Sequence, residues 1–195
     1  MKRLIDFVSS TIGLLIFSPV LVLIAILIKI DSQGPVFYRG ARAGRDGRSF
    51  RIFKFRSMVT NADKIGGPSS SADDPRITKV GAFLRKYKLD ELPQLLNVWL
   101  GQMSLVGPRP EVMQEVLLYT DEEKRLLEVR PGITDWSSIK FRDEGEILRG
   151  SVDPHQAYRE KIRPEKIRLG LEYVNQHTTW IDMRIIFQTF KVIFE

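Results

Sequence analysis

Residues 12–28 read IGLLIFSPVLVLIAILI, an almost unbroken apolar run interrupted by Gly13 and by the pair Ser18-Pro19. As a helix, the run is just long enough to cross a thin bilayer. No small-residue cleavage pattern follows it, which disfavours a signal peptide. The run therefore predicts an N-terminal membrane helix over residues 1–30.

Basic residues flank this run on both sides, as is typical of cytoplasmic segments. Lys2 and Arg3 precede it, and the residues after it are Lys29, Arg39, Arg42, Arg45, Arg48, Arg51, Lys54 and Arg56. If both flanks stay in the cytoplasm, the helix must bend back inside the membrane. Pro19 removes a backbone donor, and the Ser18 hydroxyl can satisfy the carbonyl that the proline leaves free. Because proline also occurs in true spans, charge and kink leave a re-entrant and a spanning helix both open.

The composition indicates one compact domain after this helix, over residues 31–195. A chain of 195 residues with 28% charged and 43% hydrophobic residues is neither disordered nor a multi-pass membrane protein. The net charge of +6 favours an anionic partner, with nucleic acid, anionic lipid and phosphorylated small molecules all open. The absence of cysteine excludes disulfides and thiolate metal sites, so any metal is expected to be a hard ion held by carboxylates and phosphates.

The periodicity of the remaining sequence predicts an α+β fold that is mostly helical. Residues 36–55 predict a small β-hairpin whose turn ends at Asp46-Gly47, with Lys54 and Arg56 on one strand face. Residues 61–74 have the composition of a mobile loop. Amphipathic helices are expected at residues 80–87, about 92–100, 112–127 and from 154 to the end. The last one carries the stripe Phe187, Phe190 and Phe194, which is typical of either a core face or a face lying on the bilayer surface.

The segment Lys88-Leu-Asp90-Glu91-Leu-Pro93-Gln94 carries the sharpest local signal for chemistry. Proline fits only in the first turn of a helix, so Asp90 and Glu91 are expected at or just before a helix N-terminus. Asp90 can simply cap that helix. The same geometry also suits an ionised carboxylate that meets a phosphate and attacks phosphorus. The local pattern leaves both roles open.

Phosphoryl chemistry needs cations to neutralise the phosphate oxygens. The candidate phosphate-binding residues are Lys54, Arg56, Arg85, Arg109 and Arg130. Arg109 and Arg130 stand next to prolines, in Gly107-Pro-Arg-Pro110 and Arg130-Pro-Gly132, and a rigid backbone lowers the entropy cost of aiming a guanidinium. No phosphate-binding loop of the G-x-x-x-x-G-K-[ST] type and no dinucleotide fingerprint is present in the sequence.

A series of short motifs runs in order over nearly the whole chain. They are Lys2-Arg3-x-x-Asp6, Ser18-Pro19, Gly34-Pro35-Val36-Phe37, Lys54-Phe55-Arg56-Ser57-Met58, Asp74-Pro75-Arg76-Ile77-Thr78, Leu89-Asp90-Glu91-Leu92-Pro93-Gln94, Asn97-Val98, Met103-Ser104, Gly107-Pro108-Arg109-Pro110 and Arg130-Pro131-Gly132-Ile133-Thr134. In this register they resemble the bacterial sugar transferase family, the monotopic polyprenol-phosphate phosphoglycosyl transferases. The chain resembles the minimal form, without extra N-terminal spanning helices.

The resemblance implies a reaction and roles for particular residues. A phosphosugar would pass from a UDP-sugar to polyprenol phosphate, releasing UMP, through a covalent intermediate on Asp90. Glu91 completes the family's catalytic dyad, Arg85 matches its phosphate-contacting arginine, and Mg²⁺ is implied near Asp90. The Ser18-Pro19 motif implies a re-entrant helix at the cytoplasmic face of the bacterial inner membrane, with both termini cytoplasmic. Membrane lipids and downstream glycosyltransferases are the further partners implied, while monomer and homodimer both stay open.

One departure concerns the residues after Arg130-Pro-Gly-Ile-Thr134. Many members continue with glycine and a short apolar-glutamine run, whereas this chain has Asp135-Trp136-Ser-Ser138. The sugar and the glycan pathway stay open for that reason. The closest enzymatic alternative is a hydrolase, in which water replaces the lipid acceptor. Two other classes also compete: a membrane-anchored nucleic-acid-binding protein, favoured by the aromatic and arginine residues between Phe37 and Arg56, and a membrane scaffold without catalysis. Neither of these classes uses the Asp90-Glu91 pair, so no nucleic-acid partner is expected.

Overall fold

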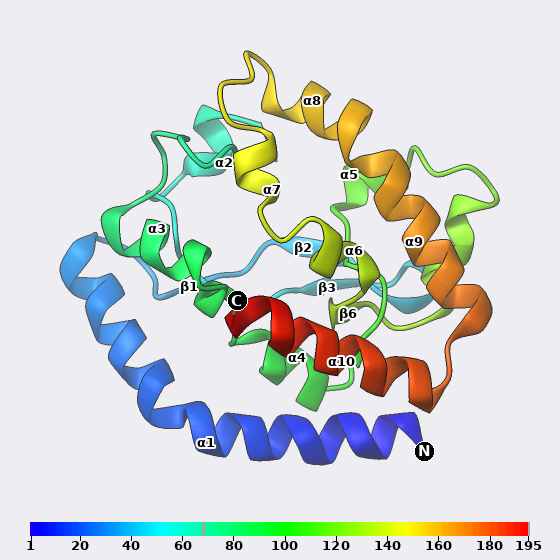
Figure 1. Ribbon diagram of the computed structural model, residues 1–195. Helices are drawn as coiled ribbons and strands as arrows, with labels where there is room; N and C mark the ends of the chain where they lie inside the picture. Colours follow the sequence, from blue (N-terminus) through cyan, green and yellow to red (C-terminus); the bar gives the residue numbers. More distant parts are fainter. Residues whose placement is uncertain (68, 195) are drawn as a thin grey trace.

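The apolar segment forms helix α1, Lys2–Asp31, in the computed structural model, which describes residues 1–67 and 69–194. α1 lies along the edge of the molecule and bends partway (Figure 1). It is long and apolar enough to cross a membrane, and most of its apolar side chains are exposed. Pro19 lies inside the helix, and Ser18 Oγ donates to the Leu15 carbonyl at 2.8 Å. That carbonyl is the one that the amide of residue 19 would have bonded, so the compensation expected from the sequence is confirmed.

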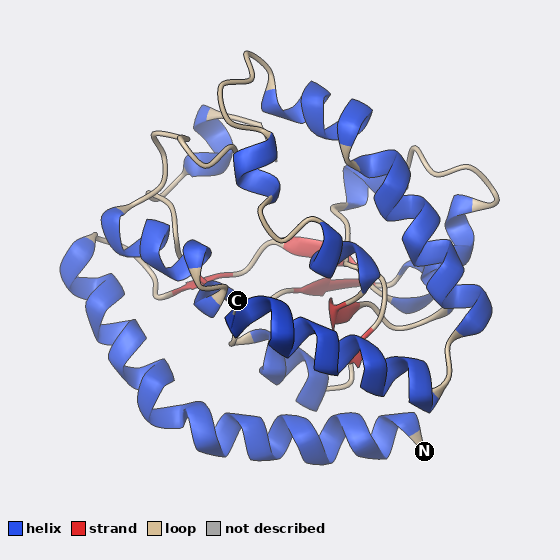
Figure 2. Ribbon diagram, in the orientation of Figure 1, coloured by secondary structure: helices blue, strands red, loops and turns tan. Residues whose placement is uncertain are grey.

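Three pairs of short strands lie among the helices (Figure 2). The strands are β1 Phe37–Tyr38, β2 Ala41–Ala43, β3 Ser49–Arg51, β4 Lys54–Phe55, β5 Ser104–Val106 and β6 Gly132–Thr134. β1 pairs with β4 and β2 with β3, both antiparallel, so the two pairs nest into one hairpin. Its turn contains Asp46 and Gly47, both with positive φ. The hairpin expected at residues 36–55 is thus confirmed, whereas the parallel β5–β6 pair was not indicated by the sequence.

Helices make up most of the remaining structure, which confirms the α+β, mostly helical fold class. They are α2 Ala62–Ile65, α3 Lys79–Lys86, α4 Gln94–Trp99, α5 Met113–Val116, α6 Trp136–Lys140, α7 Glu144–Ile147, α8 Pro154–Lys161, α9 Arg163–Gln176 and α10 Thr179–Phe194, with the 3₁₀ helices η1 Arg45–Gly47, η2 Leu89–Glu91 and η3 Glu123–Glu128. α10 buries Ile185 and exposes Trp180 and Phe187, so it is an amphipathic surface helix. The side chain of Phe194 lies outside the described residues.

The first two turns of α1 are tied to the rest of the chain by polar side chains. Lys2 Nζ pairs with Asp182 of α10 at 2.6 Å, and Arg3 donates to two carbonyls at the end of α4. Asp6 is buried, and it accepts hydrogen bonds from the Ser104 hydroxyl and from a backbone N–H of β5. The Lys2-Arg3-x-x-Asp6 motif therefore fixes the start of α1 to α10, α4 and β5.

The helix predicted at residues 112–127 is wrong in its extent. α5 ends at Val116, and η3 starts afresh at Glu123. Thr120 and Glu123 exchange hydrogen bonds between each side chain and the other's backbone N–H, at 2.9 and 3.2 Å. This reciprocal cap starts a new helical segment and so divides the predicted helix.

The segment expected as a mobile loop at residues 61–74 contains helix α2 and is held by side-chain contacts. Arg76 forms an ion pair with Asp74 at 2.6 Å and donates to the Ala62 carbonyl at 2.8 Å. The backbone N–H of Ala72 donates to the Gly145 carbonyl of α7 at 2.8 Å. These contacts place the segment against α7, where it forms one wall of the candidate site.

Candidate active site

Asp90 lies in the single 3₁₀ turn η2, which comes directly before α4. The turn begins after Lys88, whose backbone is left-handed with φ of 56°, a conformation that a non-glycine residue adopts only in a fixed local setting. The Asp90 side chain is 2% exposed. Within residues 1–67 and 69–194, no side chain caps the first turn of α4 or of η2. The hypothesis that Asp90 caps the helix is therefore wrong.

Lys54 of β4 contacts both carboxylates of the dyad. Its Nζ lies 2.8 Å from Asp90 Oδ2 and 3.2 Å from Glu91 Oε1. β4 packs directly on η2, because Phe55 lies in the same apolar cluster as Leu89. The hairpin thereby aims a lysine at the buried carboxylates, which supplies the charge that burial would otherwise leave uncompensated.

Glu91 also pairs with Arg109, which follows β5 in its proline-flanked loop. Two guanidinium nitrogens of Arg109 donate to the two Glu91 oxygens, a bidentate arrangement. Burial raises the pKa of Glu91, but the charges of Arg109 and Lys54 and the hydrogen bonds from Arg109 outweigh it. The pKa of Glu91 therefore lies well below its ordinary value, and the charge of Glu91 raises the pKa of Arg109. Glu91 is an ionised positioning group for Arg109 at neutral pH.

The dyad opens into a cleft of about 740 Å³. Asp90, Glu91, Lys54 and Arg109 line it, and so does Arg85 from α3. Burial lowers the pKa of the Arg85 guanidinium, and the nearby carboxylates of Asp90, Asp74 and Glu91 oppose that shift. Because an arginine stays charged in proteins, Arg85 is a fixed cation at the wall of the cleft. A buried carboxylate surrounded by three cations can receive a diphosphate.

Two of the five candidate cations lie elsewhere. The Arg56 guanidinium is buried at the end of α1, where it donates to the carbonyls of Gln33 and Ser32 and to the Ser32 hydroxyl. The prediction that Lys54 and Arg56 share one strand face is therefore wrong. β4 ends at Phe55, so Lys54 contacts the dyad while Arg56 bonds residues at the end of α1. Arg130 Nε donates to the Gly101 carbonyl at 3.0 Å. Both guanidinium groups therefore bond backbone carbonyls at loop and helix ends outside the cleft.

One wall of the cleft is formed by the 61–74 segment, α5 and α8. It carries a row of polar side-chain contacts that the sequence did not indicate. Ser69 Oγ lies 3.1 Å from His155 Nδ1, and His155 Nε2 lies 3.4 Å from Glu115 Oε1. Glu115 is buried and also accepts from Arg159 at 2.6 Å. Ser69, Glu115 and His155 are separated from one another by 40 or more positions in the sequence. Each belongs to an ordinary local pattern, so only the tertiary structure brings them together.

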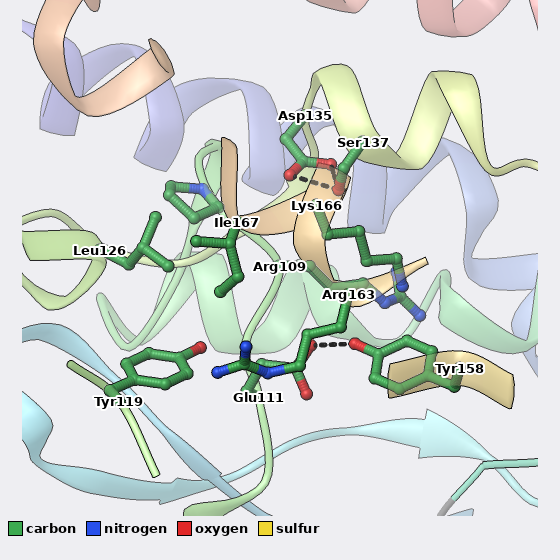
Figure 3. A pocket seen from close by; sticks show the side chains of 11 residues that line it. Arg109, Glu111, Tyr119, Leu126, Asp135, Ser137, Tyr158, Arg163, Lys166 and Ile167 are labelled. Carbon is green, nitrogen blue, oxygen red and sulfur yellow. Dashed lines mark hydrogen bonds between the residues drawn. The ribbon is translucent and has the colours of Figure 1, made fainter. Parts of the chain in front are cut away.

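A small cavity of about 20 Å³ lies beside Arg109 and has room for roughly one water molecule (Figure 3). In its lining, the Tyr158 hydroxyl donates to Glu111 at 2.7 Å, and Ser137 donates to Asp135. Asp135 is buried and caps α6 by accepting from the Ser138 N–H at 2.7 Å. The unusual Asp135 therefore fixes the start of α6 next to Arg109.

The whole chain, residues 1–195, matches the family model described as bacterial sugar transferase. The chain belongs to the bacterial sugar transferase family. It is 40% identical over 97% of its length to the UDP-glucose:undecaprenyl-phosphate glucose-1-phosphate transferase of Escherichia coli (strain K12), and covers 39% of that protein. It is 36% identical over 98% of its length to the UDP-N-acetylgalactosamine-undecaprenyl-phosphate N-acetylgalactosaminephosphotransferase of Aeromonas hydrophila, and covers 43% of it.

A third relative has a length close to that of this chain. The exopolysaccharide production protein PSS of Rhizobium leguminosarum bv. phaseoli is 39% identical over 97% of the chain, which covers 92% of that protein. The chain thus spans about two fifths of the length of the first two relatives and most of the third. For this bacterial sugar transferase, the similarity covers α1, the dyad and every wall of the cleft.

Proposed function

We propose that this protein transfers a sugar phosphate from a UDP-sugar to a polyprenol phosphate at the surface of a membrane. The observation that carries the proposal is the buried Asp90, held 2.8 Å from Lys54 in a cleft that Arg85 and Arg109 also line. The relatives named above act on UDP-sugars and undecaprenyl phosphate, which supports these two substrate classes. The apolar helix α1, next to the site, suits an acceptor that is itself a membrane lipid.

The transfer would take place in two steps that share one phosphorus atom. An Asp90 carboxylate oxygen attacks the phosphorus that bears the sugar, and the bond from that phosphorus to the bridging diphosphate oxygen breaks. UMP leaves with that oxygen and its electron pair. A phosphate oxygen of polyprenol phosphate then attacks the same phosphorus and displaces the Asp90 carboxylate, giving polyprenol diphosphate sugar. No proton has to be gained or lost at Asp90, which enters and leaves the cycle ionised.

The cations divide the charge of the diphosphate among them. Arg85 and Arg109 lie on α3 and on the loop after β5, so they approach the cleft from two different elements. Preorganised cations of this kind stabilise the charge that develops on the leaving phosphate oxygens. Lys54, which contacts both carboxylates, holds Asp90 in place and screens it from Glu91. Without this screening, the two carboxylates would repel each other and the incoming diphosphate.

The residues of the site fit a magnesium ion that is shared with substrate. Among the described residues, no group of three or more His, Cys, Asp or Glu side chains gathers to hold a metal. Magnesium in phosphoryl-transfer sites takes only one or two carboxylates from the protein and completes its shell with phosphates and water. Asp90, next to Glu91, would hold the ion, which would supply further neutralisation of the diphosphate. Chelation is expected to stop turnover, and added Mg²⁺ to restore it.

The membrane arrangement that we propose keeps both ends of α1 on the cytoplasmic face, because basic residues flank the apolar run on both sides. The bend of α1 and its Ser18–Leu15 hydrogen bond support a helix that enters and leaves one leaflet (Figure 1). Exposed aromatic residues of α10, such as Trp180 and Phe187, suit a helix lying on the same surface. Cysteines introduced near residues 2 and 33 should both resist an impermeant thiol reagent added outside intact cells. Labelling at the N-terminal site alone would indicate a spanning helix.

The decisive experiment withholds the lipid acceptor. Donor labelled in the sugar phosphate should leave label on the protein, the intact mass should rise by one phosphosugar, and the adduct should map to the peptide containing Asp90. Because acyl phosphates hydrolyse readily, the reaction is quenched within the first turnovers. Adding polyprenol phosphate should move the label into lipid. A panel of UDP-sugars in the same assay identifies the donor, since the relatives name glucose in one case and N-acetylgalactosamine in another.

A further inference from the structure

Helix α3 carries two exposed aromatic side chains that the core does not use. Phe83 is 55% exposed and Tyr87, directly after the helix, is 48% exposed. They are spaced by four residues, and their ring centroids lie 4.8 Å apart. Lys86 Nζ lies 5.5 Å from the centroid of the Tyr87 ring. Phe83, Lys86 and Tyr87 form an aromatic and basic surface, the docking surface.

The docking surface stands beside the C-terminal half of α1. Leu84 of α3 lies in one apolar cluster with Ile24 and Ile28 of α1, and Val80 packs against it. On its other sides this half of α1 exposes the apolar side chains of Leu23, Ile26, Leu27 and Ile30. A molecule that lies in the membrane along α1 therefore meets α3 next (Figure 1).

The same surface leads into the cleft. At roughly 100° per residue, the order around α3 runs from Val80 and Leu84, which face α1, through Tyr87 and Phe83 to Lys86, and then to Ala82 and Arg85. The last three of these line the cleft together with Asp90. The aromatic pair is thus the part of α3 between the membrane helix and the cations of the site, with Lys86 as the link.

We infer that Phe83, Tyr87 and Lys86 dock the lipid acceptor, an isoprenoid chain that ends in a phosphomonoester. The two rings contact the isoprene units next to the phosphate, and the Lys86 ammonium pairs with the phosphate as it passes to Arg85 and Asp90. An apolar chain with an anionic head matches this order of groups, because the exposed apolar side chains of α1 continue the contact beyond the rings. A nucleotide sugar could stack a base on the rings but has no chain to follow α1. The inference rests on the proposed function and names the place where its second substrate enters.

The test separates the two substrates. Wild-type protein, Phe83→Ala/Tyr87→Ala and Lys86→Gln are compared in detergent micelles for the KM of polyprenol phosphate and for the KM of the UDP-sugar. Exchange of labelled UMP into UDP-sugar without acceptor reports the first step alone. The double variant should raise the KM for polyprenol phosphate on the order of tenfold, with the donor KM and the exchange rate unchanged. Retained exchange also shows that each variant is folded.

Leu117→Ala/Leu118→Ala is the matched control, because these two apolar side chains are 81% and 58% exposed on another face. An unchanged acceptor KM in Phe83→Ala/Tyr87→Ala, or an equal rise in the control, would overturn the docking surface. So would loss of flotation with phospholipid vesicles in the double variant, which would indicate a general membrane contact. If wild-type protein shows no UMP exchange but makes the lipid product, the covalent step fails while the acceptor KM still decides the docking surface.

Discussion

Two dense clusters of charge, one at the start of α1 and one around Asp90, are built differently. At the start of α1, Lys2, Arg3 and Asp6 each contact a fixed partner in another element, at Asp182, the end of α4 and Ser104. Around Asp90, the cations Lys54, Arg85 and Arg109 line a cleft of about 740 Å³. The first cluster consumes its charges in holding elements together. In the second cluster Lys54 and Arg109 also pair with the dyad, but its charged groups border a volume that a substrate can enter.

The contrast separates residues that anchor elements from residues that can react, although both appear in the sequence as motifs of charged residues. Asp6 and Asp90 are almost equally buried, at 3% and 2% exposed, so burial does not distinguish them. Asp6 accepts from a hydroxyl and a backbone N–H, which are neutral donors that fix a helix on a strand. Asp90 instead pairs with a charged group, the ammonium of Lys54 on β4, and borders the cleft. Substitutions at Asp6 should therefore lower stability more than turnover, whereas substitutions at Asp90 should lower turnover more than stability.

The largest expected effect is that of Asp90→Asn. An amide is a poor nucleophile, so turnover should fall by at least about a thousandfold, while the thermal unfolding midpoint stays close to that of wild type. Asp6→Asn is the matched change in the anchoring cluster, and it should keep most of its turnover per folded molecule. Product formation and thermal unfolding are measured on both. Undiminished product formation by Asp90→Asn would leave direct transfer to the lipid phosphate as the better mechanism.

The next effect concerns the arginines of the two clusters. Arg85→Ala and Arg109→Ala should each lower kcat/KM on the order of a hundredfold, because each removes a preorganised cation from the diphosphate. Arg3→Ala, whose guanidinium bonds carbonyls at the end of α4, should change kcat/KM by less than about threefold. Steady-state kinetics with the preferred UDP-sugar measure all three. A common loss in all three variants would indicate that the arginines act on stability alone.

The third effect is on stability. Asp6→Ala leaves the Ser104 hydroxyl and a β5 N–H without their acceptor, which should cost about 2–4 kcal/mol of unfolding free energy. Asp63→Ala is the control, since Asp63 is exposed on α2. Denaturant unfolding in detergent, followed by the fluorescence of the tryptophans, compares the two variants with wild type. Equal midpoints for the two variants would show that the Asp6 contacts do not anchor α1.

The smallest effect is the response to acid. The pKa of Glu91 is lowered in the folded protein, so its ion pair with Arg109 adds stability above the ordinary carboxyl pKa of about 4.3. That contribution is lost as the pH falls through the lower, folded-state pKa. The stability difference between wild type and Glu91→Gln should therefore be full at pH 7 and shrink below about pH 4. A difference that stays constant from pH 7 to pH 3 would contradict the assigned ion pair.

Much of the fold could be predicted because its signals are local. The apolar run, the hairpin turn at Asp46-Gly47 and the short helices around residues 80–87 and 92–100 all appear where the patterns place them. The helix at residues 112–127 was too long, although Thr120-x-x-Glu123 is itself a local start signal. The β5–β6 pair could not be anticipated, because three-residue parallel strands leave no periodicity in the sequence.

The candidate site was anticipated in part, through residues whose motifs are rigid. Asp90, Glu91, Lys54, Arg85 and Arg109 come together at the cleft, whereas Arg56 and Arg130 bond backbone carbonyls elsewhere. The alternation of a strand predicts that Lys54 and Arg56 share one face. It does not show that β4 ends at Phe55, before Arg56. The polar contacts among Ser69, His155 and Glu115 join three elements that are distant in the chain. Only the packing of the 61–74 segment, α5 and α8 against one another defines that wall.

The Ser18 hydroxyl that replaces a missing amide makes two adjacent positions thermodynamically dependent on each other. While Pro19 is present, Ser18→Ala leaves the Leu15 carbonyl without its donor in an apolar stretch of helix. Once Pro19→Leu restores the amide of residue 19, the hydroxyl has no carbonyl left to rescue, and Ser18→Ala becomes nearly neutral. The two substitutions are therefore non-additive, and their coupling energy is the value of that one hydrogen bond. The requirement runs one way: position 18 needs a hydroxyl only while position 19 is proline, and it is released once residue 19 regains its amide.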